Sequence, residues 1–302
     1  MSWMLVAALS RGVYIVETGG LGYPNTVAAY IVAGEKYSAI IDTGYASSAR
    51  RVASAIVESG VASNLRYIIP THAHLDHCGA TSELASIFKG SRVYAHERAL
   101  PHLINPSRLL ESVKSIYEEH ILAAMGGMEP LDDSLSQVME DGEEIDLGGV
   151  TIRSIYTHGH APHHLSIQIV EKGYIATGDA VPSRYPFTGY FIPNTVPPKY
   201  DLDQALRSIG KIFELEPRLL LTPHYGPIFP SPELQGKYEE VIVGSVELAR
   251  RLINGGGGVE EIRSSLVTYL TGQRVFSMLH PYIQSAIKLS ALALYQTYKS
   301  ST

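Results

Sequence analysis

The chain has 302 residues, of which 45% are hydrophobic and 18% are charged. This composition predicts a folded globular chain of one or two domains and excludes disorder as its main character. The 24 Lys and Arg against 30 Asp and Glu give a net charge of −6, so we expect no nucleic-acid partner held by long-range charge. A single cysteine, Cys78, excludes an internal disulfide and CxxC chemistry, which favours a cytoplasmic location.

The first ten residues are apolar but lack the basic start of a secretory signal. No run approaches the roughly 18–20 uninterrupted apolar residues that cross a bilayer, so we expect no membrane partner. The 5 Asn and 7 Gln are few, which fits a heat-adapted source.

The first predicted elements are short β-branched and aromatic runs broken by Gly and Pro, which indicate successive hairpin strands over residues 13–16, 27–33 and 37–42. Apolar residues at helical spacing then predict a helix over residues 47–58 and, after a buried strand at 66–69, another over 81–88. A polar cluster over residues 71–78 lies between that strand and that helix, a place that functional residues favour.

The second half of the chain alternates between strand and helix patterns. An inserted helical region of about residues 97–137 follows a short strand at 93–95. Strands bounded by Gly turns are predicted at residues 145–147, 151–156, 165–170, 174–177 and, after a helix at 201–214, at 218–221. Helical patterns at 241–253, 259–270 and 282–298 follow. We therefore expect one domain over residues 1–232 and a C-terminal helical extension, 233–302, packed on it; its amphipathic pattern fits either a cover over an active site or a homodimer contact.

Four metal-ligand side chains lie within six residues: His72, His74, Asp76 and His77. Neutral imidazole and carboxylate suit zinc and other divalent first-row metals. Alternating positions in an extended loop point His72 and His74 the same way, whereas Asp76 and His77 open the next helix and face a neighbouring point. Two directions from one turn predict two metals.

Three later strand ends carry a further ligand type beside Gly or Pro: His160, Asp179 and His224. A carboxylate such as Asp179 can bridge two cations with its two oxygens, which a neutral imidazole does not do while its other nitrogen is held by a neighbour.

The run His72-x-His74-x-Asp76-His77, followed in order by His160, Asp179 and His224, resembles the metallo-β-lactamase superfamily over about residues 11–228. The resemblance implies an α/β fold of the αββα sandwich type, in which two mixed sheets pack face to face between helices.

The resemblance also implies a role for each motif residue. The first metal would be held by His72, His74 and His160, and the second by Asp76, His77 and His224. Asp179 would bridge the two metals. Asp42, at the end of an early strand, matches a family carboxylate that supports the metal ligands, with a turn cap as the equal alternative.

The chain departs from the family pattern after His160, where Ala161-Pro162-His163-His164 adds two imidazoles near the predicted site. One of them is expected to reach substrate or the outer nitrogen of a ligand. Cys78 is expected to pack as a small apolar residue and His96 to be structural. The glycines at 19, 20 and 22 lack the lysine of a phosphate loop and predict a hairpin loop.

Two divalent cations and a bridging water imply hydrolysis, because such a site lowers the pKa of the water toward neutrality and provides a hydroxide nucleophile. Zinc is the first expectation for both ions, with manganese, iron, cobalt or nickel as alternatives. Asp76 is expected to orient the water or move a proton, and His164 or Tyr225 to assist the leaving group.

The predicted substrate is a small ester. The aromatic segment 184–193 holds one cation, and no paired Lys or Arg stands near a ligand motif, so a neutral or apolar substrate fits better than a carboxylate. Phosphotriesters and phosphodiesters rank first. Carboxyl esters, lactones and thioesters, as cleaved by glyoxalase II, are the alternative, ahead of an iron oxidoreductase such as a persulfide dioxygenase, an RNA nuclease, or a non-catalytic binding module.

Overall fold

The computed structural model describes residues 5–198, 200–273 and 275–299, and the chain clusters into two compact units. The first unit consists of Met1–Tyr156, His163–Gly178 and Arg218–Ile228. The second consists of Thr157–Pro162, Asp179–Pro217 and Phe229–Thr302. The C-terminal helices therefore share a unit with two earlier segments of the chain.

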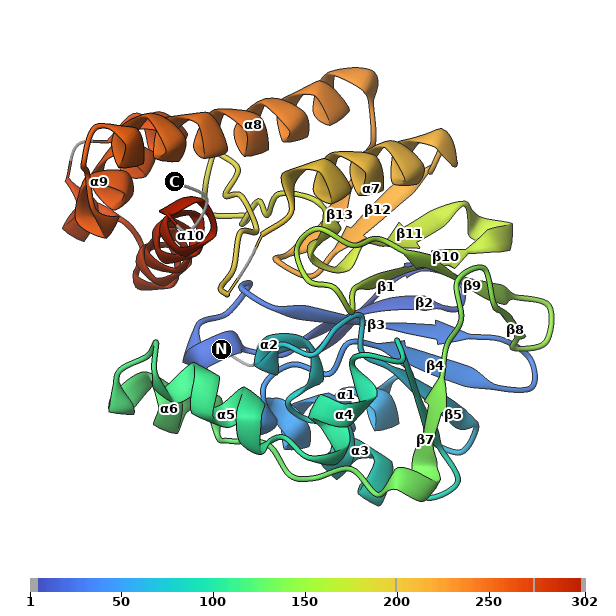
Figure 1. Ribbon diagram of the computed structural model, residues 1–302. Helices are drawn as coiled ribbons and strands as arrows, with labels where there is room; N and C mark the ends of the chain where they lie inside the picture. Colours follow the sequence, from blue (N-terminus) through green and yellow to red (C-terminus); the bar gives the residue numbers. More distant parts are fainter. Residues whose placement is uncertain (1–4, 199, 274, 300–302) are drawn as a thin grey trace. The chain divides into compact units, whose positions relative to one another are not determined.

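A seven-stranded mixed sheet lies in the first unit, as far as the chain is described (Figure 1). Its strands follow one another in sequence order: β1 (Val6–Ser10), β2 (Val13–Glu17), β3 (Ala28–Ala33), β4 (Ser38–Ile41), β5 (Leu65–Ile69), β6 (Arg92–Ala95) and β7 (Ser136–Val138). Pairing is antiparallel from β1 to β4 and parallel from β4 to β7. Because β4 and β5 are parallel neighbours, their carboxyl ends meet at one edge of the sheet.

A second mixed sheet of the first unit has the order β13-β12-β11-β10-β9-β8. Its strands are β8 (Glu144–Asp146), β9 (Thr151–Tyr156), β10 (Leu165–Ile169), β11 (Tyr174–Ala176), β12 (Leu219–Thr222) and β13 (Gly226–Ile228). Two of the Gly turns expected between these strands, Gly148-Gly149 and Glu171-Lys172-Gly173, join antiparallel neighbours, β8 to β9 and β10 to β11.

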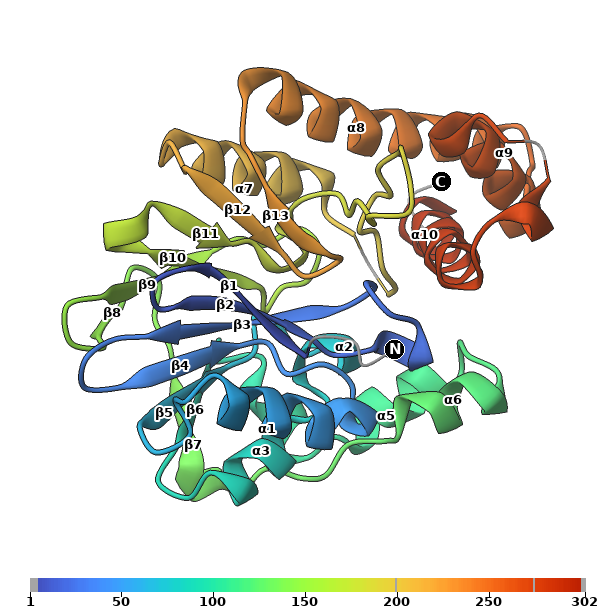
Figure 2. The same cartoon turned by 180° about the vertical axis from the view of Figure 1, so that it is seen from behind.

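The core of the first unit lies between the two sheets. Buried side chains from both, among them Tyr30, Ile41, Ile167 and Leu221, form one hydrophobic cluster. β3 and β4 are buried along almost their whole length, as expected for central strands that are covered on both faces. Figures 1 and 2 show the two sheets of this unit face to face.

α1 and α3 lie on the face of the first sheet that points away from the second (Figures 1 and 2). α1 (Ala49–Glu58) contacts β2, and α3 (Thr81–Ile87) contacts β6. α1 buries Val52, Ala55 and Ile56, three or four residues apart, so one stripe of the helix faces the sheet. The predicted helical insertion contains α4 (Leu100–Ile104), α5 (Ser107–Lys114) and α6 (Glu119–Met125).

In the described residues of the second unit there are, together with irregular segments, four α-helices. They are α7 (Leu202–Glu214), α8 (Pro232–Asn254), α9 (Val259–Thr271) and α10 (Pro281–Lys299). The last three contact one another, and α7 contacts α8 (Figure 2). No helix of the described residues combines the length and apolar character that a bilayer span needs.

Several elements differ from the sequence-based expectation. β1, β7 and β13 are strands of three to five residues that the periodicity does not predict; β7 has two exposed residues of three, so it has no apolar alternation. α8 begins at Pro232, nine residues before the predicted start at 241, because the Ser231 hydroxyl caps the Leu234 N–H and Pro232 fits the first helical turn.

Candidate metal centre

The cluster Thr71 to Cys78 lies at the carboxyl end of β5. His74 precedes the one-turn helix α2 (Leu75–Cys78), and its carbonyl accepts the N–H groups of His77 and Cys78. His72 and His77 are fully buried, whereas the side chain of Asp76 is 21% exposed. The local fold thus buries these two imidazoles and leaves Asp76 in reach of solvent. Cys78 is buried, and burial raises the pKa of its thiol well above the usual value, which fits the packing role expected for it.

Asp42, which follows β4, fixes both ends of this cluster. Its Oδ1 accepts the Thr71 N–H at 2.8 Å and the Thr71 hydroxyl at 2.9 Å. Its Oδ2 lies 2.9 Å from Nδ1 of His77. Because a carboxylate only accepts, Nδ1 of His77 carries the proton and Nε2 keeps its lone pair for a metal. The residue has a positive φ of 60°, a backbone strain that tends to occur at functional sites.

His224, just after β12, is held in the same way by a different partner. Its Nδ1 lies 3.1 Å from the carbonyl oxygen of Thr26, in the connection between β2 and β3. A carbonyl also only accepts, so Nδ1 of His224 donates and Nε2 is the lone-pair nitrogen.

Asp76, His77 and His224 bring three ligand atoms within 4.8 Å of one another. Oδ2 of Asp76 lies 3.6 Å from Nε2 of His77 and 3.6 Å from Nε2 of His224. This separation is too long for a hydrogen bond, but two ligands each about 2.0–2.2 Å from one tetrahedral cation are about 3.4 Å apart. Two imidazole nitrogens and one carboxylate oxygen fit a divalent first-row metal with an open position for water or substrate.

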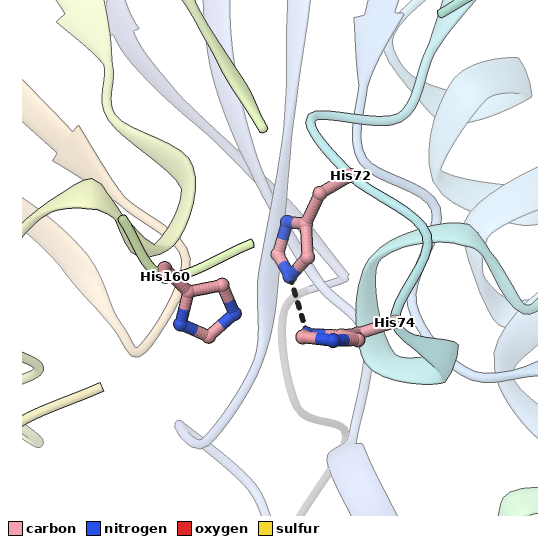
Figure 3. A group of neighbouring side chains, drawn as sticks. All are labelled: His72, His74 and His160. Atoms are coloured by element: carbon pink, nitrogen blue, oxygen red, sulfur yellow. Dashed lines mark hydrogen bonds between the residues drawn. The ribbon is translucent and has the colours of Figure 1, made fainter. Parts of the chain in front are cut away.

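His72 and His74 point to one place, as their alternating positions predict (Figure 3). Nε2 of His72 lies 2.8 Å from Nδ1 of His74, and Nδ1 of His72 lies 3.1 Å from the Thr71 hydroxyl. Thr71 therefore connects the His72 ring to Asp42.

His160 and Asp179 belong to the second unit, where their side chains meet. Nε2 of His160 lies 3.4 Å from Oδ2 of Asp179, and both side chains are buried. Nδ1 of His160 donates to the carbonyl of Asn194 at 2.6 Å. His160, which Figure 3 also labels, thus repeats the pattern of His77 and His224, with Nδ1 held by an acceptor and Nε2 beside a carboxylate.

His164 and Tyr225, the two residues expected to assist a leaving group, occupy different surroundings. His164 is fully buried, and its ring lies 4.9 Å from the ring of His72. Burial and the neighbouring carboxylate of Glu17 raise the pKa of the Tyr225 phenol well above its usual value. Their roles in proton transfer stay predictions.

Some supporting contacts are not visible in the sequence. His163, one of the extra imidazoles, accepts the Ala73 N–H at 3.3 Å through Nδ1, and Ala73 lies between His72 and His74 in the chain. Its ring also lies 5.6 Å from that of His102, for which the sequence predicts no role. Glu17 and Thr26 carry no motif signal, because their contacts join positions far apart in the chain.

Gly159 precedes His160, and the chain can turn there only without a side chain. Its φ is 125°, and an added Cβ would lie 2.4 Å from the backbone nitrogen of Ala205 in α7. We expect Gly159→Ala to lower the free energy of unfolding by about 3 kcal/mol, from overpacking and backbone strain together. Gly210→Ala, in the same helix as Ala205 and with open space around it, should instead stabilise by about 0.5–1 kcal/mol. Urea unfolding midpoints test the pair; equal midpoints would contradict the close packing at Gly159.

Comparison with known proteins agrees with this geometry. The model of the metallo-beta-lactamase superfamily matches residues 22–224. A metallo-beta-lactamase fold-containing protein of Sulfurisphaera tokodaii is 30% identical over 268 residues, covering 87% of this chain and 97% of that protein. A hydroxyacylglutathione hydrolase of Haemophilus influenzae is 28% identical over 195 residues, covering 64% of this chain and 81% of that protein.

The fold is also that of solved structures. The crystal structure of a metallo-beta-lactamase family protein from Thermus thermophilus aligns with a TM-score of 0.69 at 22% identity, covering 95% of this chain and 93% of that chain. The predicted fold class is thereby confirmed. Since the family model spans every motif from His72 to His224, the chain belongs to the metallo-beta-lactamase superfamily.

Proposed function

We propose that this protein is a hydrolase that holds two divalent metal ions and cleaves ester bonds, thioesters first. Members of the superfamily are metallo-hydrolases, and the described residues include clusters able to hold a metal. The observation that carries the proposal is the equal 3.6 Å separation of the Asp76 carboxylate from two imidazole nitrogens. We propose His72, His74 and His160 for one ion, Asp76, His77 and His224 for the other, and Asp179 for the bridge.

When bound, two such cations lower the pKa of a water and polarise the bond to be cleaved. The residues of the chain prepare this site before any metal arrives. Asp42 and the Thr26 carbonyl keep a proton on Nδ1 of His77 and His224, so each Nε2 is ready to bind. The partly exposed Asp76 is placed to orient a water or accept its proton.

The choice among esters rests on the leaving group. An alkoxide needs a proton as it leaves, whereas a thiolate, whose conjugate acid has a pKa of about 8.5, is stable enough to leave without one. Burial and the Glu17 carboxylate raise the pKa of the Tyr225 phenol, and His164 is fully buried, which supports a leaving group that does not depend on a proton from either. The similarity to a hydroxyacylglutathione hydrolase points the same way. We therefore rank thioesters above carboxyl esters, and both above the phosphoesters that the sequence alone favours.

The test is metal content together with a substrate panel. We expect elemental analysis of the purified protein to find two metals per chain. The kcat/KM for an acyl-glutathione thioester should exceed that for a phosphodiester or phosphotriester at least 100-fold. A chelator should abolish turnover, added zinc should restore it, and Asp179→Ala should remove it. Fastest cleavage of a phosphoester would overturn the thioester assignment. One iron per chain with oxygen consumption and no hydrolysis would overturn the hydrolase.

A further inference from the structure

Three consecutive residues, Pro223 to Tyr225, contact the stretch from Glu17 to Ala28, which comprises the end of β2, the connecting loop and the start of β3. The Pro223 carbonyl accepts the Ala28 N–H at 2.8 Å. Nδ1 of His224 donates to the Thr26 carbonyl at 3.1 Å, and the Tyr225 phenol interacts with the Glu17 carboxylate. The orientation of His224 therefore depends on how this segment is held.

Glu17, the last residue of β2, closes that segment into a loop. Its side-chain oxygens accept the Gly19 N–H at 2.7 Å and the Asn25 N–H at 2.7 Å, at the two ends of the loop. The residue is 4% exposed. Burying a carboxylate is costly unless hydrogen bonds compensate, and here two backbone N–H groups do so, one on each oxygen. A buried charge in this position indicates a constraint beyond simple packing.

Thr26 connects this closed loop to His224. Its hydroxyl donates to the Tyr23 carbonyl at 2.8 Å and lies 3.2 Å from the Gly20 carbonyl. These bonds fix the direction of the Thr26 backbone, whose carbonyl meets His224. The Arg51 side chain adds a further bond, from Nε to the Glu17 carbonyl at 2.9 Å. Glu17 is thus connected to His224 in two ways: through the loop that ends at Thr26, and through Tyr225, the next residue in the chain.

We propose that Glu17 is a positioning residue for the metal ligand His224, acting through the closed loop 18–26 and through Tyr225. The proposal rests on the metal site of the proposed function. Glu17 does not touch the predicted ligand atoms of that site; it sets the direction of one of them. Removing the Glu17 carboxylate should lower the affinity for one metal ion and not for the other, because the bonds of His72, His74 and Asp42 do not depend on this loop.

The experiment compares metal affinities in Glu17→Gln, Tyr225→Phe and the control Glu35→Gln, which alters an exposed carboxylate. A glutamine offers one acceptor oxygen where two are needed, so one end of the loop loses its partner. In competition with a chromophoric chelator, we expect Glu17→Gln to lower zinc affinity at one site about 10–100-fold and to leave the other unchanged. Tyr225→Phe should lower the same affinity by a smaller factor, and Glu35→Gln should match the wild type. The d–d absorption of the cobalt-substituted protein should change for one ion only.

Each outcome decides between the two proposals. Two zinc sites of unchanged affinity in Glu17→Gln would overturn the role of Glu17 and leave the hydrolase intact. Equal weakening of both sites would also overturn it, since general destabilisation acts on both. If Glu17→Gln does not fold, Tyr225→Phe decides, because it leaves both backbone bonds of Glu17 in place. A wild-type protein that binds fewer than two metals would instead contradict the proposed function.

Discussion

Asp76→Asn is expected to lower kcat/KM about 1,000-fold and to leave one tightly bound metal per chain. The carboxylate oxygen lies 3.6 Å from Nε2 of both His77 and His224, so it supplies the negative charge of this ligand group. An amide of the same shape is neutral and offers a single weak ligand oxygen. Losing about 4 kcal/mol of charge stabilisation corresponds to a rate loss of about 1,000-fold.

The measurements are elemental analysis after dialysis and kcat/KM on the best substrate of the panel. Glu83→Gln, which removes an exposed carboxylate from the neighbouring helix α3, is the matched control and should keep both metals and full activity. If Asp76→Asn keeps two metals but loses activity, Asp76 serves the water or its proton and is not a ligand. Two metals and activity within about threefold of the wild type would remove Asp76 from the site.

The part of the site that the sequence predicts is local. His72, His74, Asp76 and His77 lie within six residues, so their types and spacing are visible together. The strand before them and the helix after them follow from apolar periodicity. The predicted sandwich, which the resemblance carried by these motifs implies, is confirmed. The strand patterns alone predict most of its strands, which are β-branched runs bounded by Gly turns.

The supporting contacts are not local, and the sequence cannot show them. Thr26 and His224 are 198 positions apart and meet through a backbone carbonyl, which every residue type has. Glu17 reads as an ordinary polar residue at the end of a strand; its role depends on two backbone N–H groups and a phenol that only the folded chain brings near. Short strands such as β7 depend on pairing with a neighbour rather than on their own pattern.

For Asp42 the sequence leaves two roles equally weighted, a turn cap and a support for the metal ligands. A carboxylate after a strand serves equally as a turn cap or as a support for a ligand, and the pattern favours neither. The structure shows both contacts on one side chain, with Oδ1 on Thr71 and Oδ2 on His77. The two roles can be separated by experiment, because they use different oxygens.

We expect Asp42→Asn to fold and yet to lower the affinity for one metal about 10–100-fold. Asparagine tolerates the positive φ of 60°, and its oxygen can still accept both Thr71 donors. Its NH₂ group then faces Nδ1 of His77, which must become an acceptor and shift the ring proton to Nε2. A protonated Nε2 cannot bind a metal. Asp42→Ala, by contrast, strains the backbone and leaves the Thr71 N–H without its acceptor, so it should lower the free energy of unfolding by about 3 kcal/mol.

Long-range ¹H–¹⁵N spectra of the metal-free protein report which ring nitrogen of His77 carries the proton. The proton should lie on Nδ1 in the wild type and on Nε2 in Asp42→Asn, and the chelator competition should show the weakened site in the same sample. If the proton stays on Nδ1 and both affinities are unchanged, Asp42 acts only as the cap of the Thr71 turn. If the proton moves to Nε2 and the affinity for one metal falls, Asp42 controls metal binding by fixing the tautomer of His77 through its bond to Nδ1.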